Sequence, residues 1–199
     1  MLTDSSLTGV PLTCRHTVCD KLAALRGACI LRNGGLIAHQ TATLAGIAAA
    51  TDKPAALQLL TRFKQRRGPF LLLADDLRTA ARLSRYFSSA LRRQMRASWP
   101  GPVTLVFSGR PGLPASCYHH GLLAVRVDAS LQVRQLAHAS GGLLLSSSLN
   151  RQGCEPLQPD IKTQMRFHRY LDGRVSGTAS TGKASAIIRI KRKHLTIIR

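Results

Sequence analysis

The residues of this 199-residue chain that could do chemistry form short polar segments beside apolar runs. Lys64-Gln65-Arg66-Arg67-Gly68 follows an apolar helical stripe and precedes an apolar run. A lysine and an arginine two positions apart, entering a glycine turn, can converge on one phosphate group from two directions. The same cations could equally offset the macrodipole at a helix C-terminus. Taken alone, this segment leaves both interpretations open.

Three further polar groups stand at or near the ends of expected strands. Ser146-Ser147-Ser148-Leu149-Asn150 follows an apolar strand, where α/β proteins place ligand contacts, although an ordinary turn has the same composition. Thr41-Ala42-Thr43 lies beyond another strand end. Arg126 lies inside the apolar run LLAVRV, so it must pair, reach a strand end or bind an anion, unless it points to solvent.

Several catalytic motifs are absent from the sequence. It contains no GxxxxGK[ST] phosphate-binding loop, no GxGxxG fingerprint and no GxSxG nucleophile elbow. Glu155 is the single glutamate, and the one adjacent acidic pair, Asp75-Asp76, stands at an expected helix start, where capping is common. Chemistry that needs two facing carboxylates is therefore disfavoured. Any reaction is expected to depend on positioning and on cations, as nucleotidyl transfer does.

Positive charge dominates the composition. Lysine and arginine number 29 against 9 acidic residues, which gives a formal net charge of +20. Such a charge repels itself in a compact protein and favours a polyanionic partner, although a genome rich in arginine codons would produce the same excess. We expect contact with nucleic acid. The aromatic content of 5% argues against recognition of single strands by base stacking.

The cysteines and the apolar residues indicate a cytoplasmic globular protein. Five cysteines at irregular spacing are typical of reduced thiols. Cys14-Arg15-His16-Thr17-Val18-Cys19 could offer zinc ligands, but no second ligand pair accompanies it, so no metal site is predicted. No apolar run reaches the length of about 18 residues that a membrane helix needs, and the first residues lack a secretory signal pattern. One domain is predicted over residues 1–199.

Apolar periodicity predicts helices and strands that alternate without forming a plain βαβ series. Helices are expected at about 13–26 with Gly27 as the stop, from Asp52-Lys53-Pro54 to the Lys64 segment, from the Asp76 cap to 83, and at 88–98, 130–139 and 163–171. Strands are expected at 36–40, 70–74, 103–107, 122–127, 143–147, 185–190 and 195–198, with a loop at 173–184. The pattern predicts an α/β fold with a mixed sheet covered by helices.

The order of the segments is similar to that of one family. The matching segments are GGLIAHQT (34–41), FKQRRG (63–68), WPGPVTLVF (99–107), LAVRV (123–127) and SSSLNRQG (146–153). Their sequence and spacing resemble those of the YrdC-like threonylcarbamoyl-AMP synthases of the short, single-domain type, over roughly residues 20–199. WPGPVT is the most specific segment. The resemblance implies a twisted mixed α/β sheet, flanked by helices, with a basic concave face.

The resemblance also implies an activity. Such enzymes condense L-threonine, bicarbonate and ATP into threonylcarbamoyl-adenylate and release pyrophosphate. A downstream threonylcarbamoyl transferase uses the product to modify an adenosine beside the anticodon of certain tRNAs. ATP is then a substrate, Mg²⁺ is expected with it, and tRNA or double-stranded RNA is expected on the basic face. Attack of a carbamate oxygen on the α-phosphorus needs no protein nucleophile, which fits the shortage of acids.

The phosphate side of the family's site matches this sequence closely. Lys64 and Arg66 match a Lys-x-Arg pair that resembles a clamp on the ATP phosphates, so both are expected to be catalytic and ATP-binding. Ser148 and Asn150 match the Ser and Asn of a Ser-Ala-Asn motif at the nucleotide site. Ser185 matches the serine of a late Pro-Ser-Thr motif and completes the expected ATP-binding set.

The threonine side matches less well. Thr41 and Arg126 match the expected substrate-binding threonine of Pro-Thr-Glu and the strand arginine of Val-Arg-Val. However, His39-Gln40-Thr41-Ala42 replaces Tyr-Pro-Thr-Glu, so a proline and a carboxylate are missing. Further departures are Ala45, Leu149, Ala184 and Ala186. Two alternatives therefore stay open: a non-catalytic tRNA- or double-stranded-RNA-binding module of the same fold, and a carbamoyl transfer that uses another acceptor.

Overall fold

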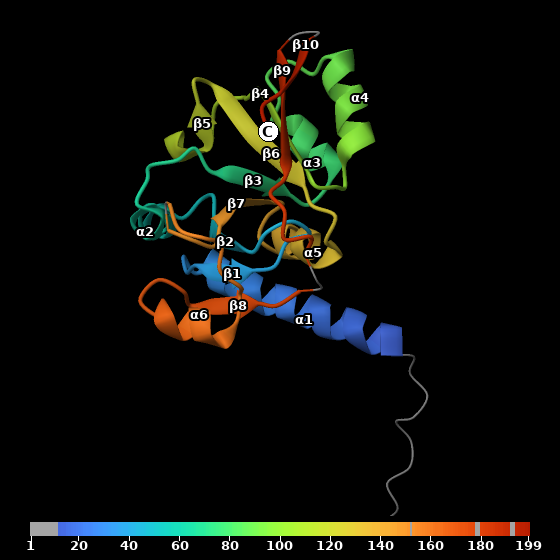
Figure 1. Ribbon diagram of the computed structural model, residues 1–199. Coiled ribbons are helices and arrows are strands. Elements are labelled where there is room, and N and C mark those ends of the chain that lie inside the picture. The colour runs from blue at the N-terminus through green and yellow to red at the C-terminus, as the bar shows by residue number, and fades with distance from the viewer. Residues whose placement is uncertain (1–11, 152, 178–179, 192–193) are drawn as a thin grey trace, which may run out of the picture.

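Ten strands pair into one mixed sheet in the computed structural model, which describes residues 12–151, 153–177, 180–191 and 194–199 (Figure 1). The strands are β1 (Ile37–His39), β2 (Gly46–Ala50), β3 (Leu71–Ala74), β4 (Val103–Ser108), β5 (Tyr118–His119), β6 (Leu122–Val127), β7 (Leu143–Ser148), β8 (Gly173–Val175), β9 (Ala186–Lys191) and β10 (His194–Ile197). Their order is β10-β9-β4-β6-β3-β7-β2-β1-β8, and β5 pairs with β6 off this path. The predicted mixed α/β sheet is confirmed.

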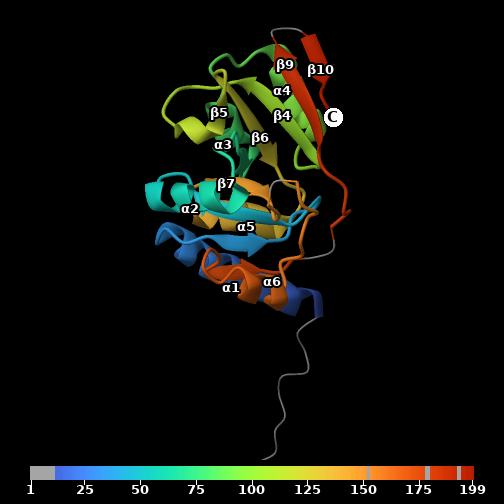
Figure 2. The ribbon, with the colours of Figure 1, turned by 60° about the vertical axis from the view of Figure 1, so that its left-hand side comes forward.

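The helices pack along this sheet. They are α1 (Leu12–Arg32), α2 (Pro54–Lys64), α3 (Leu77–Arg82), α4 (Ser89–Ser98), α5 (Leu131–Ala139) and α6 (Ile161–Arg166), with a 3₁₀ turn at Ala115–Cys117. Figures 1 and 2 show α1 and α6 at the β8 end of the sheet and α4 at the β9–β10 end. None of the helices in the described part of the chain is long and apolar enough to cross a membrane.

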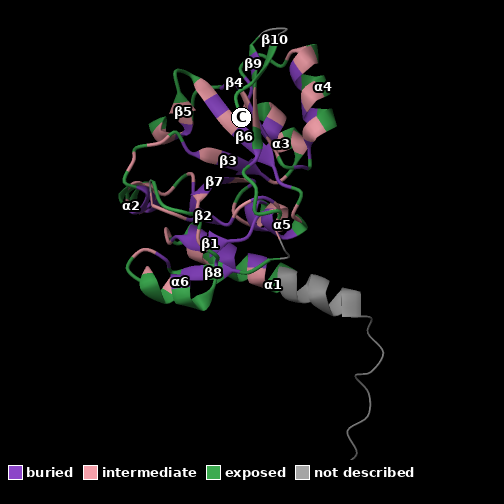
Figure 3. Ribbon diagram, in the orientation of Figure 1, coloured by how far each residue is buried: buried purple, intermediate pink, exposed green. Residues whose placement is uncertain are grey.

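The centre of the sheet is its most buried part. The apolar run that ends in β3 lies between β6, to which β3 is parallel, and β7, to which it is antiparallel. This confirms the prediction of a central, doubly covered strand at 70–74. β1 and β2 are buried along their whole length (Figure 3).

Helices cover the two faces of the sheet unequally. On one face, Phe63 of α2 and Leu91 of α4 belong to a core cluster that includes Leu72 and Val125. On the other face, α1 and α5 form a separate cluster with Leu73 and other residues of β1, β2, β3, β7 and β8. This second cluster contains no residue of β4, β6 or β9. Part of the second face is therefore open, and it forms one wall of the cavity described below.

Helix α1 continues past Gly27, so the predicted stop there is wrong. A Cβ at Gly27 would lie 2.7 Å from Val175 Cγ2 and 3.1 Å from Leu136 Cδ1. The glycine therefore lets α1 lie close to β8 and α5, and it does not end the helix. The chain turns instead at Gly34, whose φ of +86° favours glycine.

Three strands were missed by the sequence prediction: β2, β8 and the two-residue β5. β2 has the sequence GIAAA, and alanine and glycine have low β-propensity. Its strand conformation comes from pairing with both β1 and β7. β8 lies in the predicted loop 173–184, where pairing with β1 makes three residues extended. The strand conformation of β2 and of β8 is therefore decided by pairing partners that are distant in the sequence.

Side-chain capping marks the start of three of the five α-helices whose N-cap is described, and it is lacking in α2 and α5. Asp76 accepts a hydrogen bond from Thr79 N at 2.7 Å, which confirms the predicted cap of α3, and Ser88 caps α4. Asp160 caps α6, so this helix begins two residues before the predicted 163. Helix α2 has Lys53 at its N-cap without a side-chain bond, so Asp52 does not cap it.

Candidate active site

A cavity of ≈ 440 Å³ opens over the part of the sheet that α1 and α5 leave uncovered. Its walls come from β4, β6, β7 and β9, from the loop after β1, from the segment between α2 and β3, and from the end of the chain. The polar lining residues are Thr41, Thr43, Arg66, Thr104, His119, Arg126, Ser146, Ser147, Ser148, Ser185 and Arg199. Three arginines and a series of hydroxyls thus face a space whose lining contains no carboxylate side chain. A larger basic concave face stays a prediction.

Arg66 is fixed at the edge of this cavity. Its Nη1 donates to Pro69 O at 2.8 Å and its Nη2 to Ser147 Oγ at 3.3 Å, while its Cζ lies 5.0 Å from the centre of the Phe70 ring. Burial lowers the pKa of Arg66, yet a guanidinium keeps its charge in proteins. These contacts leave a cationic, planar donor group oriented along the cavity wall, as anion binding requires.

Lys64 does not line the cavity, in contrast to its predicted partner Arg66. Its buried ammonium donates to Ser148 O and Asn150 Oδ1, both at 2.8 Å, and to Asn150 O. Burial, with a smaller effect of Arg66, lowers the pKa of Lys64 from 10.5 to about 8. Ser148 Oγ lies 3.5 Å away as a fourth acceptor, so all contacts of the ammonium go to Ser148 and Asn150 and Lys64 fixes the turn that follows β7.

The remaining expected ATP-binding residues divide in the same way. Ser148 and Ser185 line the cavity, and Asn150 does not. Ser185 Oγ lies 3.0 Å from Thr104 Oγ1, which ties the segment before β9 to β4. Ser148 Oγ donates to Asn150 Oδ1 at 2.6 Å, so the asparagine acts on the cavity through the serine that it holds.

Thr41 and Arg126 lie close together, as predicted for the amino-acid side, but they are linked through Thr43. Thr41 Oγ1 donates to Leu44 O at 2.6 Å and lies 3.0 Å from Thr43 Oγ1. Arg126 Nη1 donates to the same Thr43 Oγ1 at 2.7 Å. The loop after β1 is therefore held against β6 by hydrogen bonds between buried side chains.

Asp128 is the important residue that sequence reasoning missed. Its carboxylate is fully buried and pairs with Arg126 Nη2 at 2.9 Å. Its Oδ1 accepts from the backbone N of Ala42 at 3.0 Å and of Ser130 at 2.9 Å. Arg126 is thus paired rather than pointing to solvent. The signal was available in the sequence, because Asp128 is the first acid after the strand that carries this buried arginine.

His39 occupies the position of the family's tyrosine and lies behind the cavity. Its side chain is buried, and Nε2 lies 3.1 Å from Ser146 Oγ. Burial lowers the pKa of His39 from 6.5 to about 4, with Asp128 opposing the shift and Arg126 adding to it. The imidazole is therefore neutral at physiological pH.

This burial predicts an acid-sensitive contribution to stability. Between pH 6.5 and 4 the unfolded chain protonates His39 and the folded protein does not, so the free energy of unfolding falls as the pH falls. A His39→Gln variant is expected to lose this part of the pH dependence. Urea unfolding of both proteins at pH 7, 6, 5 and 4.5 measures the difference. Parallel curves for the two proteins would show that His39 does not titrate in this range.

The described side chains do not provide a metal site. No group of three His, Cys, Asp or Glu residues lies close enough among them to hold a metal ion. The Cys14–Cys19 segment lies outside the residues whose side chains are described. Because magnesium prefers carboxylate and phosphate oxygens, the cavity lining does not form a magnesium site of its own.

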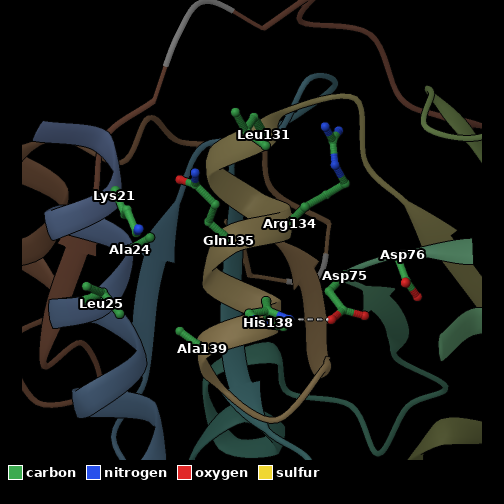
Figure 4. Close-up of a pocket in the computed structure, with 10 residues that line it drawn as sticks. All are labelled: Lys21, Ala24, Leu25, Asp75, Asp76, Leu131, Arg134, Gln135, His138 and Ala139. Carbon is green, nitrogen blue, oxygen red and sulfur yellow. Dashed lines mark hydrogen bonds and ion pairs between the residues drawn. The ribbon is translucent and has the colours of Figure 1, made fainter. Parts of the chain in front are cut away.

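A second cavity of ≈ 310 Å³ lies between α1, α5 and the end of β3. Figure 4 shows His138 Nδ1 directed at Asp75 Oδ2, 2.9 Å away, with Asp76 pointing elsewhere, consistent with its capping role. None of the residues predicted for the site lines this space. Five of the seven predicted site residues line the first cavity, and Lys64 and Asn150 line neither of the two.

Comparisons with known proteins agree on the kind of molecule. The family model Sua5_yciO_yrdC, described as telomere recombination, matches residues 29–199. A threonylcarbamoyl-AMP synthase of Methylococcus capsulatus is 32% identical over 155 residues, which cover 74% of this chain and 83% of that protein. E. coli YciO has a similar fold, with a TM-score of 0.80 and 21% identity over 90% of this chain and 89% of that one. P. abyssi Sua5 complexed with L-threonine also has a TM-score of 0.80, with 20% identity over 90% of this chain and 54% of that one.

Proposed function

This chain belongs to the Sua5/YciO/YrdC family, and from that premise we propose that it is a threonylcarbamoyl-AMP synthase. It would condense L-threonine, bicarbonate and ATP and release pyrophosphate, in the formation of threonylcarbamoyladenosine in tRNA. The observation that carries the proposal is the cavity, where Arg66, Arg126 and Arg199 face a hydroxyl-rich wall without a carboxylate side chain. Relatives more than 30% identical over most of their length are named as this enzyme.

The reaction would use the cavity for positioning and charge compensation. The threonine amine and bicarbonate give a carbamate and release water, and an oxygen of the carbamate then attacks the α-phosphorus of ATP as the bond to the pyrophosphate oxygen breaks. Arg66 is placed to offset the charge that develops on the leaving pyrophosphate, with Ser148 and Ser185 as hydroxyl partners of the nucleotide. No protein nucleophile forms a covalent intermediate. A magnesium ion would enter with the phosphates of ATP, whose oxygens would hold it.

Lys64 and Asn150 would act indirectly. Because the Lys64 ammonium is occupied by acceptors on Ser148 and Asn150, it positions the turn that presents the Ser148 hydroxyl. The two predicted ATP-binding residues outside the cavity lining thus support those within it.

The amino-acid side of the cavity is assigned to the loop after β1. Thr41, Thr43 and Arg126 line it, and Asp128 holds the Ala42 backbone from behind. P. abyssi Sua5, a relative in fold, has been solved as a complex with L-threonine. The missing carboxylate at Ala42 makes recognition of the threonine amine the step most open to change in this chain.

One experiment tests the proposal directly. Purified protein is incubated with ATP, L-threonine and bicarbonate, and pyrophosphate is measured with each component omitted in turn. We expect release of pyrophosphate only in the complete mixture. Turnover of ATP that does not depend on threonine would contradict the proposed activity.

A non-catalytic RNA-binding module of the same fold is the second candidate. The absence of the family's carboxylate at Ala42 favours it. This candidate predicts binding of tRNA or double-stranded RNA that weakens steeply with salt. Calorimetric titration of threonine into the ATP-loaded protein separates the two, because only a synthase is expected to give heat.

A further inference from the structure

A large part of the surface away from the cavity lacks negative charge. Between Asp76 and Asp128 the sequence contains eight arginines and no acidic residue. Seven of these arginines are exposed, and Arg126 is the exception. They lie on α3, α4 and the loops beside them. Clustered cations without acidic neighbours repel one another, and an anionic partner relieves that repulsion.

A groove of ≈ 550 Å³ runs through this region. It is lined by Tyr86, Leu91, Phe107 and Leu122 on an apolar side and by Arg189 and Lys191 of β9. Leu91 and Phe107 belong to the core cluster on the α4 face, whereas Thr104 and Val106 of the same strand line the candidate active site. Leu122, however, lines both spaces, so the groove adjoins the candidate active site at the start of β6.

Two exposed aromatic rings follow one another here, each beside an arginine: Tyr86 lines the groove, and Phe87 is the next residue, outside its lining. Tyr86 is 66% exposed and Phe87 is 43% exposed. The guanidinium of Arg85 lies 5.4 Å from the centre of the Tyr86 ring, and that of Arg92 lies 5.3 Å from the Phe87 ring. Neither ring is needed to fill the core. Ring and cation together form a surface that binds both the face of a base and a phosphate.

The segment that carries the rings is held in place by hydrogen bonds. Ser84 is buried, and its Oγ donates to Tyr86 O at 2.9 Å. Arg85 N donates to Ser108 O at 2.9 Å, and Arg110 Nε donates to Ser84 O at 2.9 Å. Ser88 then caps α4. The rings are thus presented on a preorganised backbone, which lowers the entropy lost on binding.

We propose that this groove binds single-stranded nucleic acid, with bases stacked on Tyr86 and Phe87 and phosphates held by the surrounding arginines. The low aromatic content of the whole chain argued against such a mode, but the placement of these two rings reverses that argument. A duplex would leave the rings without stacked partners. Insertion into a membrane is disfavoured because the apolar residues of α4, Leu91 and Met95, are buried in the core. The site does not depend on the synthase activity.

Fluorescence anisotropy tests the proposal with labelled single-stranded RNA and DNA of about 12 nucleotides and a blunt duplex of the same sequence. We expect Tyr86→Ala to weaken binding of the single strands about tenfold and to leave binding of the duplex unchanged. Tyr86→Phe keeps the ring and is expected to retain affinity. In Tyr86→Trp, the fluorescence of the new indole should be quenched by the oligonucleotide, which reports stacking at this position.

Matched variants separate stacking from general charge. Arg92→Ala and Arg32→Ala each remove one exposed arginine of a helix, but only Arg92 lies beside one of the two rings, that of Phe87. Arg92→Ala is expected to weaken binding severalfold more than Arg32→Ala. Equal effects of the two, equal weakening of single-strand and duplex binding in Tyr86→Ala, or displacement of the oligonucleotide by anionic phospholipid vesicles with unchanged affinity in Tyr86→Ala would each overturn the proposal. Loss of threonine-dependent activity alone would leave it standing.

Discussion

Arg66→Ala is expected to lower the rate of threonine-dependent pyrophosphate release about 100-fold, while the fold stays intact. Arg66 lines the cavity and donates to its wall from a fixed orientation, so alanine removes a preorganised cation from the place where charge develops. Losing one such donor in a closed site typically lowers kcat by about 10²–10³-fold. Initial rates at saturating ATP, threonine and bicarbonate measure the effect.

Arg67 provides the matched control, because it is the next residue, equally charged and exposed. Arg67→Ala is expected to keep the activity within about twofold, since surface charges contribute little at this distance from the chemistry. Arg66→Lys keeps the charge but loses the planar, two-pronged donor, so an intermediate rate is expected. Equal rates in Arg66→Ala and Arg67→Ala would remove Arg66 from the proposed mechanism.

Asp128→Ala is expected to lower the free energy of unfolding by about 3–5 kcal/mol, the usual effect of breaking a buried ion pair. The substitution leaves the buried guanidinium of Arg126 without its charge partner and the backbone N of Ala42 without its acceptor. Since small domains have a total stability of about 5–15 kcal/mol, this is a large share. Urea unfolding followed by circular dichroism measures it.

Two further variants test whether the loss of stability comes from breaking the Arg126–Asp128 pair or from removing any carboxylate. Asp52→Ala removes a carboxylate whose side chain is 74% exposed, and it is expected to change stability by less than about 0.5 kcal/mol. Replacing Arg126 and Asp128 together with leucine removes both charges, so a smaller loss than in Asp128→Ala is expected. If Asp128→Ala and Asp52→Ala unfold at the same urea concentration, the ion pair does not stabilise the fold.

Local sequence patterns predicted the helices and strands whose own residues favour that secondary structure. The apolar runs that became β3, β4, β6 and β7 and the capped start of α3 were predicted correctly. The sequences of β2 and β8 carry little strand signal, because these segments become extended only by pairing with other strands. Gly27 was misread for a related reason: its meaning depends on Val175, which lies far along the chain.

The candidate site was predicted in its membership better than in its geometry. Three residues predicted from the order of the motifs, Arg66, Ser148 and Ser185, line one cavity, because strand ends meet there. The direction of Lys64 could not be foreseen, because a lysine at a helix end gives no sign of which acceptors it will meet. Asp128 was missed although it is the first acid after the strand of Arg126, because the packed sheet is needed to show that Arg126 is buried and which partner it meets.

The sheet order has a consequence for how the molecule assembles. The contacts that frame the cavity join distant positions: Arg126 and Thr43 are 83 residues apart, and Asp172 and Leu36, which fix β8 beside β1, are 136 apart. The chain loses loop-closure entropy before such contacts form, so folding through them is slow. Ser185 can reach Thr104 only after β9 joins β4. Under the proposed function, a nucleotide site that includes Ser185 therefore forms only after β9 has been synthesised and has paired with β4.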